Sequence, residues 1–180
     1  GGNTEVLIKA ALEPFVKEGH TIHEFFLSKK KVAPCTACDA CAEDGICVIE
    51  DDMQEILERY NKCDAMIVGS PVYSRNISAQ LLAVFNRFHC IAHKKSSRNN
   101  VLYAGAIAVG GSPNAPGITL SLIYNFLLSR GACCVPAVVN GVTAVARERG
   151  VVSDQPKSLG EAKILGENIL KVLKKTKNTA

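Results

Sequence analysis

Four cysteines lie within thirteen residues of this chain, at Cys35, Cys38, Cys41 and Cys47. Their spacing is C-x2-C-x2-C-x5-C, and the residues in the two-residue gaps are small enough for successive thiolates to curl around one centre. Four thiolates at this spacing are the ligands that a [4Fe–4S] cluster prefers. Because such a cluster passes one electron at a time, the motif points to redox chemistry and predicts a cluster-binding loop at 34–48.

Other uses of these thiols stay open. Structural zinc also binds four thiolates, but usually from two separated C-x2-C pairs. A disulfide framework is disfavoured because closely spaced cysteines crowd one another and nothing suggests secretion. Redox-active or unligated thiols in an ordinary loop are the remaining alternative. His89, Cys90 and His93 have metal-like spacing at a helix end, but such trios are common, and we expect no metal there.

The composition indicates one globular domain over residues 1–180. With 180 residues, of which 47% are hydrophobic, the chain is large enough to form a full hydrophobic core. No stretch is long enough to span a bilayer, and no signal peptide is visible at the start. Eight cysteines without secretory features indicate a reducing compartment, so we expect a cytoplasmic protein without a membrane partner. The net charge of +4 is small for a protein of this length, and the lysine runs of the chain have no aromatic residues among them. We therefore expect no nucleic-acid role.

Helical and strand patterns alternate along the chain. Apolar spacing and capping residues predict helices at 3–18, from Asp51 or Asp52 onward, at 78–88, at 117–129 and at 158–175. Strands are predicted at 21–27, 65–69, 102–109 and 133–139. Strands that are apolar on both faces and alternate with helices predict an α/β fold, a doubly wound parallel sheet with helices on both faces. Pro14 is expected to bend the first helix or end it early.

The first strand of such a sheet is missing from the given N-terminus, because the chain opens on a helix. A doubly wound sheet needs its first strand in the middle. An empty slot would leave unpaired backbone groups in the core, each costing on the order of 1–3 kcal/mol. We therefore expect roughly fifteen further residues upstream of Gly1, which form an apolar strand and a turn.

Three loops carry a resemblance to a known family. Gly2-Asn3-Thr4, at a helix start, resembles the end of the S-x-R-x-x-G-N-T phosphate loop of NADPH-dependent FMN reductase-like flavoproteins, which have a flavodoxin-like fold. Gly69-Ser70-Pro71-Val72-Tyr73 and the helix start at 78–81 are similar to the flavin-ring loop and helix of that family. Val109-Gly110-Gly111 matches its third loop. The Ser and Arg of the first loop are not in this chain. With the cysteine motif added, the chain resembles an iron–sulfur flavoprotein.

The resemblance implies an FMN site that three loops form together. A helix N-terminus suits a phosphate dianion, and ligands of parallel sheets lie beyond the carboxyl ends of the strands. Paired glycines let the backbone approach the flavin closely. The residues implied are Asn3, Thr4, Pro71, Val72, Tyr73, Ser74, Asn76, Gly110 and Gly111. The metal ligands implied are the four motif cysteines.

The function implied is electron transfer between a ferredoxin-like low-potential carrier, a [4Fe–4S] cluster and FMN. The final acceptor would be a small molecule such as oxygen, peroxide or a quinone, and the protein would be a homo-oligomer, a dimer or a tetramer. The alternative is an FMN or quinone reductase that takes electrons directly from NAD(P)H, with the cysteines idle or binding zinc. A flavin-binding sensor without turnover is a weaker third hypothesis.

Overall fold

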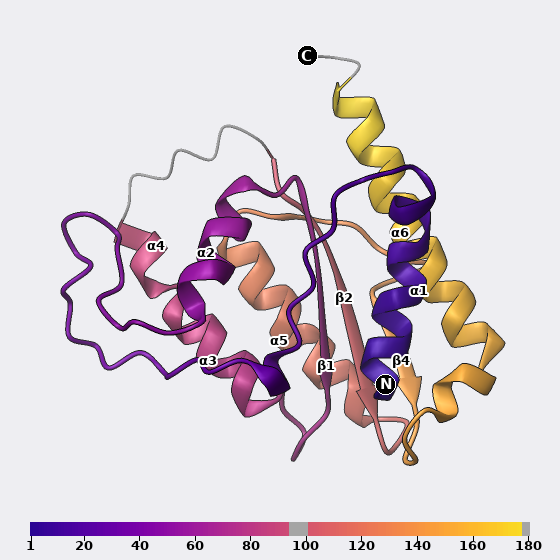
Figure 1. The fold of residues 1–180 in the computed structure, drawn as a ribbon. Coiled ribbons are helices and arrows are strands. Elements are labelled where there is room, and N and C mark those ends of the chain that lie inside the picture. The colour runs from indigo at the N-terminus through magenta and orange to yellow at the C-terminus, as the bar shows by residue number, and fades with distance from the viewer. Residues whose placement is uncertain (94–100, 178–180) are drawn as a thin grey trace. The chain divides into compact units, whose positions relative to one another are not determined.

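The computed structural model describes residues 1–93 and 101–177 (Figure 1). The chain divides into two compact units. Unit 1 comprises Gly1–Ile22, Asp64–Ile77 and Val101–Ala180, and unit 2 comprises His23–Cys63 and Ser78–Asn100. A single domain over 1–180 stays a prediction.

Unit 1 is built on a parallel sheet whose central strand is β2 (Tyr103–Gly110). In the described part of the chain, β2 pairs in parallel with β1 (Ala65–Pro71), β3 (Cys133–Cys134) and β4 (Val142–Val145). Every residue of β2 is buried, as its continuous apolar run predicts. The strand-by-strand register runs from Ala65 opposite Tyr103 to Pro71 opposite Val109, so β1 and β2 end at the same edge of the sheet.

Helices cover both faces of this sheet, so the predicted α/β class is confirmed. Ile107 and Val109 of β2 lie in one core with residues of α1 (Asn3–Lys17) and α6 (Pro156–Lys177). The alternate positions of β2 are small, and the α-carbon of Gly110 lies against the start of α5 (Ala115–Ser129). Among the described helices, none is both long and apolar enough to cross a membrane.

Two strand predictions were wrong. Residues 21–26 form no regular element and lead into η1 (Leu27–Lys29). A strand needs a neighbour to complete its ladder, and no described strand pairs with this segment. The strand predicted at 133–139 stops at Cys134, since Pro136 has no N–H to donate and the Ala137 N–H donates to Asn140 O, 2.6 Å away, in a turn. The chain re-enters the sheet as β4, which sequence reasoning did not predict.

The first helix extends almost as far as predicted and does not end early at Pro14, one of the two outcomes expected of that residue. α1 continues to Lys17 with Pro14 buried inside it. Proline removes one helical hydrogen bond, but the next turn still closes because the Glu18 N–H donates to Pro14 O at 3.2 Å. α1 therefore presents an unbroken face to α6.

Unit 2 packs α2 (Met53–Lys62), α3 (Ala79–Arg87) and the short α4 (His89–His93) beside the cysteine loop. Tyr60 and Phe88 meet edge to face with ring centroids 4.7 Å apart. Ser78 caps α3 by accepting from the Leu81 N–H at 3.3 Å. Asp52 occupies the N-cap position of α2 but makes no side-chain cap hydrogen bond; the Asp51 carboxylate instead accepts from the Met53 N–H.

The contact between α1 and α6 yields a stability test. A Cβ at Gly166 would overlap the backbone carbonyl of Ala11, which cannot move without shifting α1. We expect Gly166→Ala to lower the free energy of unfolding in urea by about 1–3 kcal/mol. Gly160, in the same helix, has no atom within 4 Å of an added Cβ. Gly160→Ala should instead raise stability by about 0.5–1 kcal/mol, because alanine favours the helix. Equal effects of the two variants would contradict close packing at Gly166.

Candidate functional site

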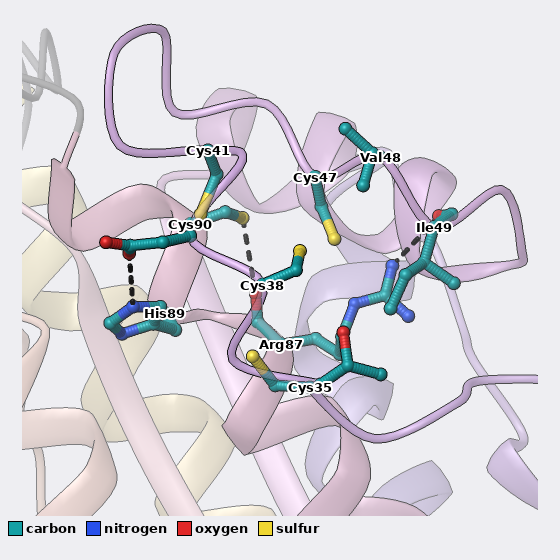
Figure 2. Close-up of a pocket in the computed structure, with 11 residues that line it drawn as sticks. Cys35, Cys38, Cys41, Cys47, Val48, Ile49, Arg87, His89 and Cys90 are labelled. Atoms are coloured by element: carbon teal, nitrogen blue, oxygen red, sulfur yellow. Dashed lines mark hydrogen bonds and ion pairs between the residues drawn. The ribbon is translucent and has the colours of Figure 1, made fainter.

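The motif cysteines gather at one pocket of unit 2 (Figure 2). In Figure 2 their sulfur atoms point toward the same space. Side chains of α3 and α4 complete the walls, and the polar and cysteine residues that line the pocket are Cys35, Thr36, Cys38, Asp39, Cys41, Cys47, Arg87, His89 and Cys90. The four cysteines that are closely spaced in the sequence therefore line the same pocket in the structure.

The loop bends sharply enough to bring the thiols together. Ala37 and Asp39 have φ of 54° and 60°, in the left-handed region that non-glycine residues rarely adopt. The Ala37 N–H donates to Cys35 Sγ at 3.4 Å, and the Gly45 N–H closes a turn on Cys41 O at 2.9 Å. A left-handed residue costs roughly 1–2 kcal/mol, so the surrounding structure must hold these bends in place.

The side chain that holds the loop is Arg87. Its side chain is 0% exposed and sits at the end of α3. Nη1 donates to Asp51 Oδ2 at 2.7 Å and to Ala33 O at 3.0 Å, and Nη2 donates to Ile49 O at 3.0 Å. Ala33 lies just before the first motif cysteine and Ile49 just after the last. One guanidinium therefore ties both ends of the cysteine loop.

Asp51 completes this tie from the other side. Its carboxylate accepts from Arg87 and from the backbone N–H groups of Ala33 and Met53, at 2.7 to 3.0 Å. Burial opposes ionisation of this group, but the hydrogen bonds from Arg87 and the two N–H groups prevail and hold the pKa of Asp51 below its usual value. The pair is therefore charged at neutral pH, as a permanent guanidinium against a stable carboxylate.

The thiols differ in how readily they ionise. A hydrogen bond from the Ala40 N–H, with a second from the Thr36 hydroxyl, lowers the pKa of the exposed Cys38 thiol. Burial raises the pKa of Cys41 and of Cys90. Metal binding requires the thiolate form, which Cys38 reaches more readily than the buried thiols.

The donors around the pocket fit an iron–sulfur cluster. Arg87 Nε is buried and has no hydrogen-bond partner within the described residues. Thiolate and sulfide sulfur accept hydrogen bonds and would satisfy such a donor. Across residues 1–93 and 101–177, no three His, Cys, Asp or Glu side chains already stand at metal-binding geometry. The site is therefore defined by four thiols and a buried N–H that line one pocket, and among the described residues the thiols do not yet stand at metal-binding distances from one another.

Arg87 is a pocket residue that sequence reasoning missed, and Cys90, considered with His89 and His93 as a metal trio and set aside, also lines the pocket. Cys90 is 2% exposed, and its thiol donates to Arg87 O at 3.2 Å. His89 also lines the pocket, with Nε2 4.0 Å from Asp39 Oδ1, whereas the side chain of His93 lies outside the described residues. One signal was present in the sequence: Arg87 follows Leu81 and Val84 at helical spacing, on the buried side of α3.

The second candidate site lies in unit 1, at the edge where β1 and β2 end. All the predicted FMN residues belong to this unit. In Figure 1 the ends of β1 and β2 and the start of α1 lie at the same edge of unit 1, the lower one in this view. The structure therefore brings the three predicted loops together, as expected for ligand binding beyond the carboxyl ends of parallel strands.

The loop after β1 presents Tyr73 to solvent. Tyr73 and Asn76 exchange backbone hydrogen bonds of 3.0 and 2.9 Å across a tight turn. The central residues of the turn, Ser74 and Arg75, have φ of 50° and 62°, where glycine or asparagine is usual. The Tyr73 side chain is 61% exposed, so its ring is accessible to a planar ligand.

The glycine pair at the end of β2 contacts the loop after β1 and also Arg147, which the sequence analysis did not single out. A Cβ at Gly110 would lie 3.1 Å from the Val72 side chain, so glycine lets the two loops approach closely. The Val72 N–H donates to Val109 O at 2.8 Å, which ties the first loop to the end of β2. Arg147 Nε donates to the exposed carbonyl of Gly111 at 2.9 Å. Arg147 was missed because β4, which leads into it, was missed.

The start of α1 is held by its own side chains. Asn3 Nδ2 donates to Glu148 O at 2.7 Å, and Asn3 Oδ1 accepts from the Val152 N–H at 3.2 Å. The Thr4 methyl group packs against the α-carbon of Gly69. The N-cap residue is Gly2, which has no side chain to cap the first turn. The Asn3 amide thus positions the start of α1, and a helix N-terminus is a favourable place for an anion.

Comparisons with known proteins agree with the sequence resemblance. A family profile described as NADPH-dependent FMN reductase matches residues 1–145. An iron–sulfur flavoprotein of Methanocaldococcus jannaschii is 35% identical over 96% of this chain and 91% of that protein. An iron–sulfur flavoprotein of Methanosarcina thermophila is 44% identical over 63% of this chain and 59% of that protein.

Solved structures agree on the fold. A Trp repressor binding protein from Bacillus subtilis matches with a TM-score of 0.65 at 20% identity, over 92% of this chain and 93% of that one. A flavodoxin, WrbA-like protein from Agrobacterium tumefaciens matches with a TM-score of 0.61 at 18% identity, over 96% of this chain and 90% of that one. These matches confirm the flavodoxin-like fold. The family profile and the sequence relatives show that the chain belongs to the NADPH-dependent FMN reductase family and, within it, to the iron–sulfur flavoproteins.

Proposed function

We propose that this chain is an electron-transfer flavoprotein that binds a [4Fe–4S] cluster on Cys35, Cys38, Cys41 and Cys47 and FMN at the strand-end loops of unit 1. The observation that carries the proposal is the convergence of four thiols and a buried, partly unpartnered arginine on one pocket. The names of the iron–sulfur flavoproteins that resemble this chain over most of its length support it.

The arrangement favours a cluster over zinc or idle thiols. A compact loop that closes on itself suits a centre whose ligands come from one short segment. The Arg87 guanidinium, fixed beside the thiols, offsets part of their negative charge. Idle thiols would leave the buried Nε of that side chain without a partner, which costs free energy.

The unit 1 residues have separate tasks in holding FMN. The first turn of α1 offers backbone N–H groups to the phosphate, and Asn3 keeps that turn in place. Tyr73 offers its exposed ring to the isoalloxazine, and the glycine pair keeps side chains away from it. When bound, the flavin accepts electrons singly or in pairs and the cluster passes them one at a time.

The proposal extends to partners and setting. The donor is a ferredoxin-like low-potential carrier, and the acceptor is a small molecule such as oxygen, peroxide or a quinone. The protein works as a homo-oligomer, a dimer or a tetramer, in the cytoplasm. The partners and the assembly rest on the family resemblance, and the cytoplasmic setting rests on eight cysteines without secretory features.

A second candidate function is direct reduction of FMN or a quinone by NAD(P)H. The description of the matched family, NADPH-dependent FMN reductase, favours it. The absorbance spectrum of anaerobically purified protein separates the two. A brown protein whose colour bleaches with dithionite supports the cluster, whereas a yellow protein that oxidises NAD(P)H rapidly supports the reductase.

Substitution of Cys38 tests the ligand assignment. We expect Cys38→Ala to lose most of its iron and inorganic sulfide, because the centre would lack one of its four ligands. FMN should stay bound, since its residues belong to the other unit. Iron, sulfide and flavin assays after anaerobic purification measure both quantities.

Cys133→Ala is the matched control, because Cys133 is an exposed thiol on β3 of unit 1. It should retain wild-type iron, sulfide and FMN. Full iron content in Cys38→Ala would remove Cys38 from the ligand set. Loss of both iron and flavin would mean that the loop serves the fold as a whole.

Substitution of Tyr73 tests the flavin site. We expect Tyr73→Ser to weaken FMN binding by about tenfold, near the low end of 1–3 kcal/mol for stacking of an aromatic side chain on a base. Tyr73→Phe should keep most of the affinity if the ring makes the contact. Quenching of FMN fluorescence gives the dissociation constants.

Leu128→Ala controls for general loss of exposed apolar surface, because Leu128 on α5 is also 61% exposed. Its FMN affinity should equal that of the wild type. Unchanged affinity in Tyr73→Ser would exclude Tyr73 from the site.

A further inference from the structure

Arg87 differs from every other charged side chain in the described part of the chain. It is the only charged residue there that is buried, with 1% of its surface exposed. Burying a charge costs free energy unless hydrogen bonds and an opposite charge compensate it. A buried arginine beside a redox pocket therefore needs an explanation.

Protein groups compensate this charge only in part. Asp51 is its carboxylate partner, but the same carboxylate also accepts two backbone hydrogen bonds. Two carbonyls, of Ala33 and Ile49, take further N–H groups of the guanidinium. Nε remains buried and without a partner among the described residues. The guanidinium thus has positive charge and a donor still available.

The guanidinium of Arg87 lies near the cysteine side chains of the pocket. Arg87 lines the same pocket as the four motif cysteines, and Figure 2 shows its guanidinium beside Cys47. Four thiolates make a metal centre anionic, and one more electron makes it more so. A fixed positive charge at this position stabilises the reduced form more than the oxidised form.

We propose that Arg87 is a positioning residue with two roles toward this centre. It ties Ala33 and Ile49 so that the motif loop stays closed, and its charge raises the one-electron reduction potential of the centre that the thiols hold. The inference rests on the proposed function, in which that centre is a [4Fe–4S] cluster. The electron comes from dithionite in the experiment below and from a low-potential carrier in the cell, and the charge on Arg87 does not change.

Two substitutions at one ion pair separate charge from structure. Arg87→Met removes the positive charge, and Asp51→Asn removes the negative one. Both break the same 2.7 Å ion pair and loosen the same loop ends. If Arg87 acts only by holding the loop, the two variants should shift the potential in the same direction. If its charge acts on the centre, they should shift it in opposite directions.

The experiment uses the full chain, purified anaerobically with its cofactors. Iron and sulfide content reports how well the centre is held, and a dithionite titration followed by visible absorbance reports its potential. Circular dichroism and the melting temperature check that each variant is folded. Arg87→Lys is the conservative variant, because it keeps the charge and loses the planar fork that bridges Ala33 and Ile49.

We expect Arg87→Met to lower the potential by about 59 mV, a tenfold smaller ratio of reduced to oxidised centre at a given potential. Asp51→Asn should raise it. Arg87→Lys should stay near the wild-type potential but lose iron faster. If Arg87→Met retains no iron, Asp51→Asn decides alone, and a lowered or unchanged potential there overturns the charge role.

The failure modes are distinct. Wild-type protein without iron and sulfide refutes the proposed function and this inference with it. Wild-type protein with a full centre, whose potential does not change in Arg87→Met, refutes only the inference. A shift of the same sign in Arg87→Met and Asp51→Asn does so as well.

Discussion

The ion pair of Arg87 and Asp51 is the interaction on which the cysteine pocket depends. Both groups are buried or nearly so, with side-chain exposures of 0% and 10%. Each satisfies backbone groups at the two ends of the loop in addition to its partner. The loop contains left-handed residues, and its large apolar side chains Ile46 and Val48 are 61% exposed, so it has few other means of staying closed. The pair therefore converts a cysteine-rich segment into a pocket with fixed walls.

In unit 1 the parallel sheet brings three loops to the edge where β1 and β2 end. The buried strand β2 sets the register, and parallel pairing with β1 makes both strands end together. α1 packs closely on α6 through Gly166, and the Asn3 amide holds the start of α1 to residues 148–152. The same backbone constraints that build the sheet thus place a helix N-terminus, a tyrosine loop and a glycine pair at a common edge.

Local patterns in the sequence predicted much of this arrangement. The apolar runs of β1 and β2 and the helical spacing of α2, α3, α5 and α6 were sufficient, because burial dictates them residue by residue. The cysteine spacing predicted convergence for a different reason, because two-residue gaps let successive thiolates turn toward one centre. The strand predicted at 21–27 was wrong because a strand forms only beside a partner strand, and a local sequence pattern does not reveal whether a partner is present. β4 was missed because it is short and follows a turn after Pro136.

Sequence patterns could not place Arg87 and Cys90 at the pocket, for a related reason. They lie about forty residues after the last motif cysteine and join it only through the packing of α3 and α4. An arginine on the apolar face of a short helix was the one local signal. Arg147 was hidden in the same way, since its contact with Gly111 exists only once β4 is placed beside β2.

The most direct test of the account is the metal, sulfide and flavin content of the full chain, made and purified without oxygen. The account predicts about four iron and four sulfide ions with one FMN per chain. Stoichiometric FMN with neither iron nor sulfide, or with zinc on the thiols, would contradict it.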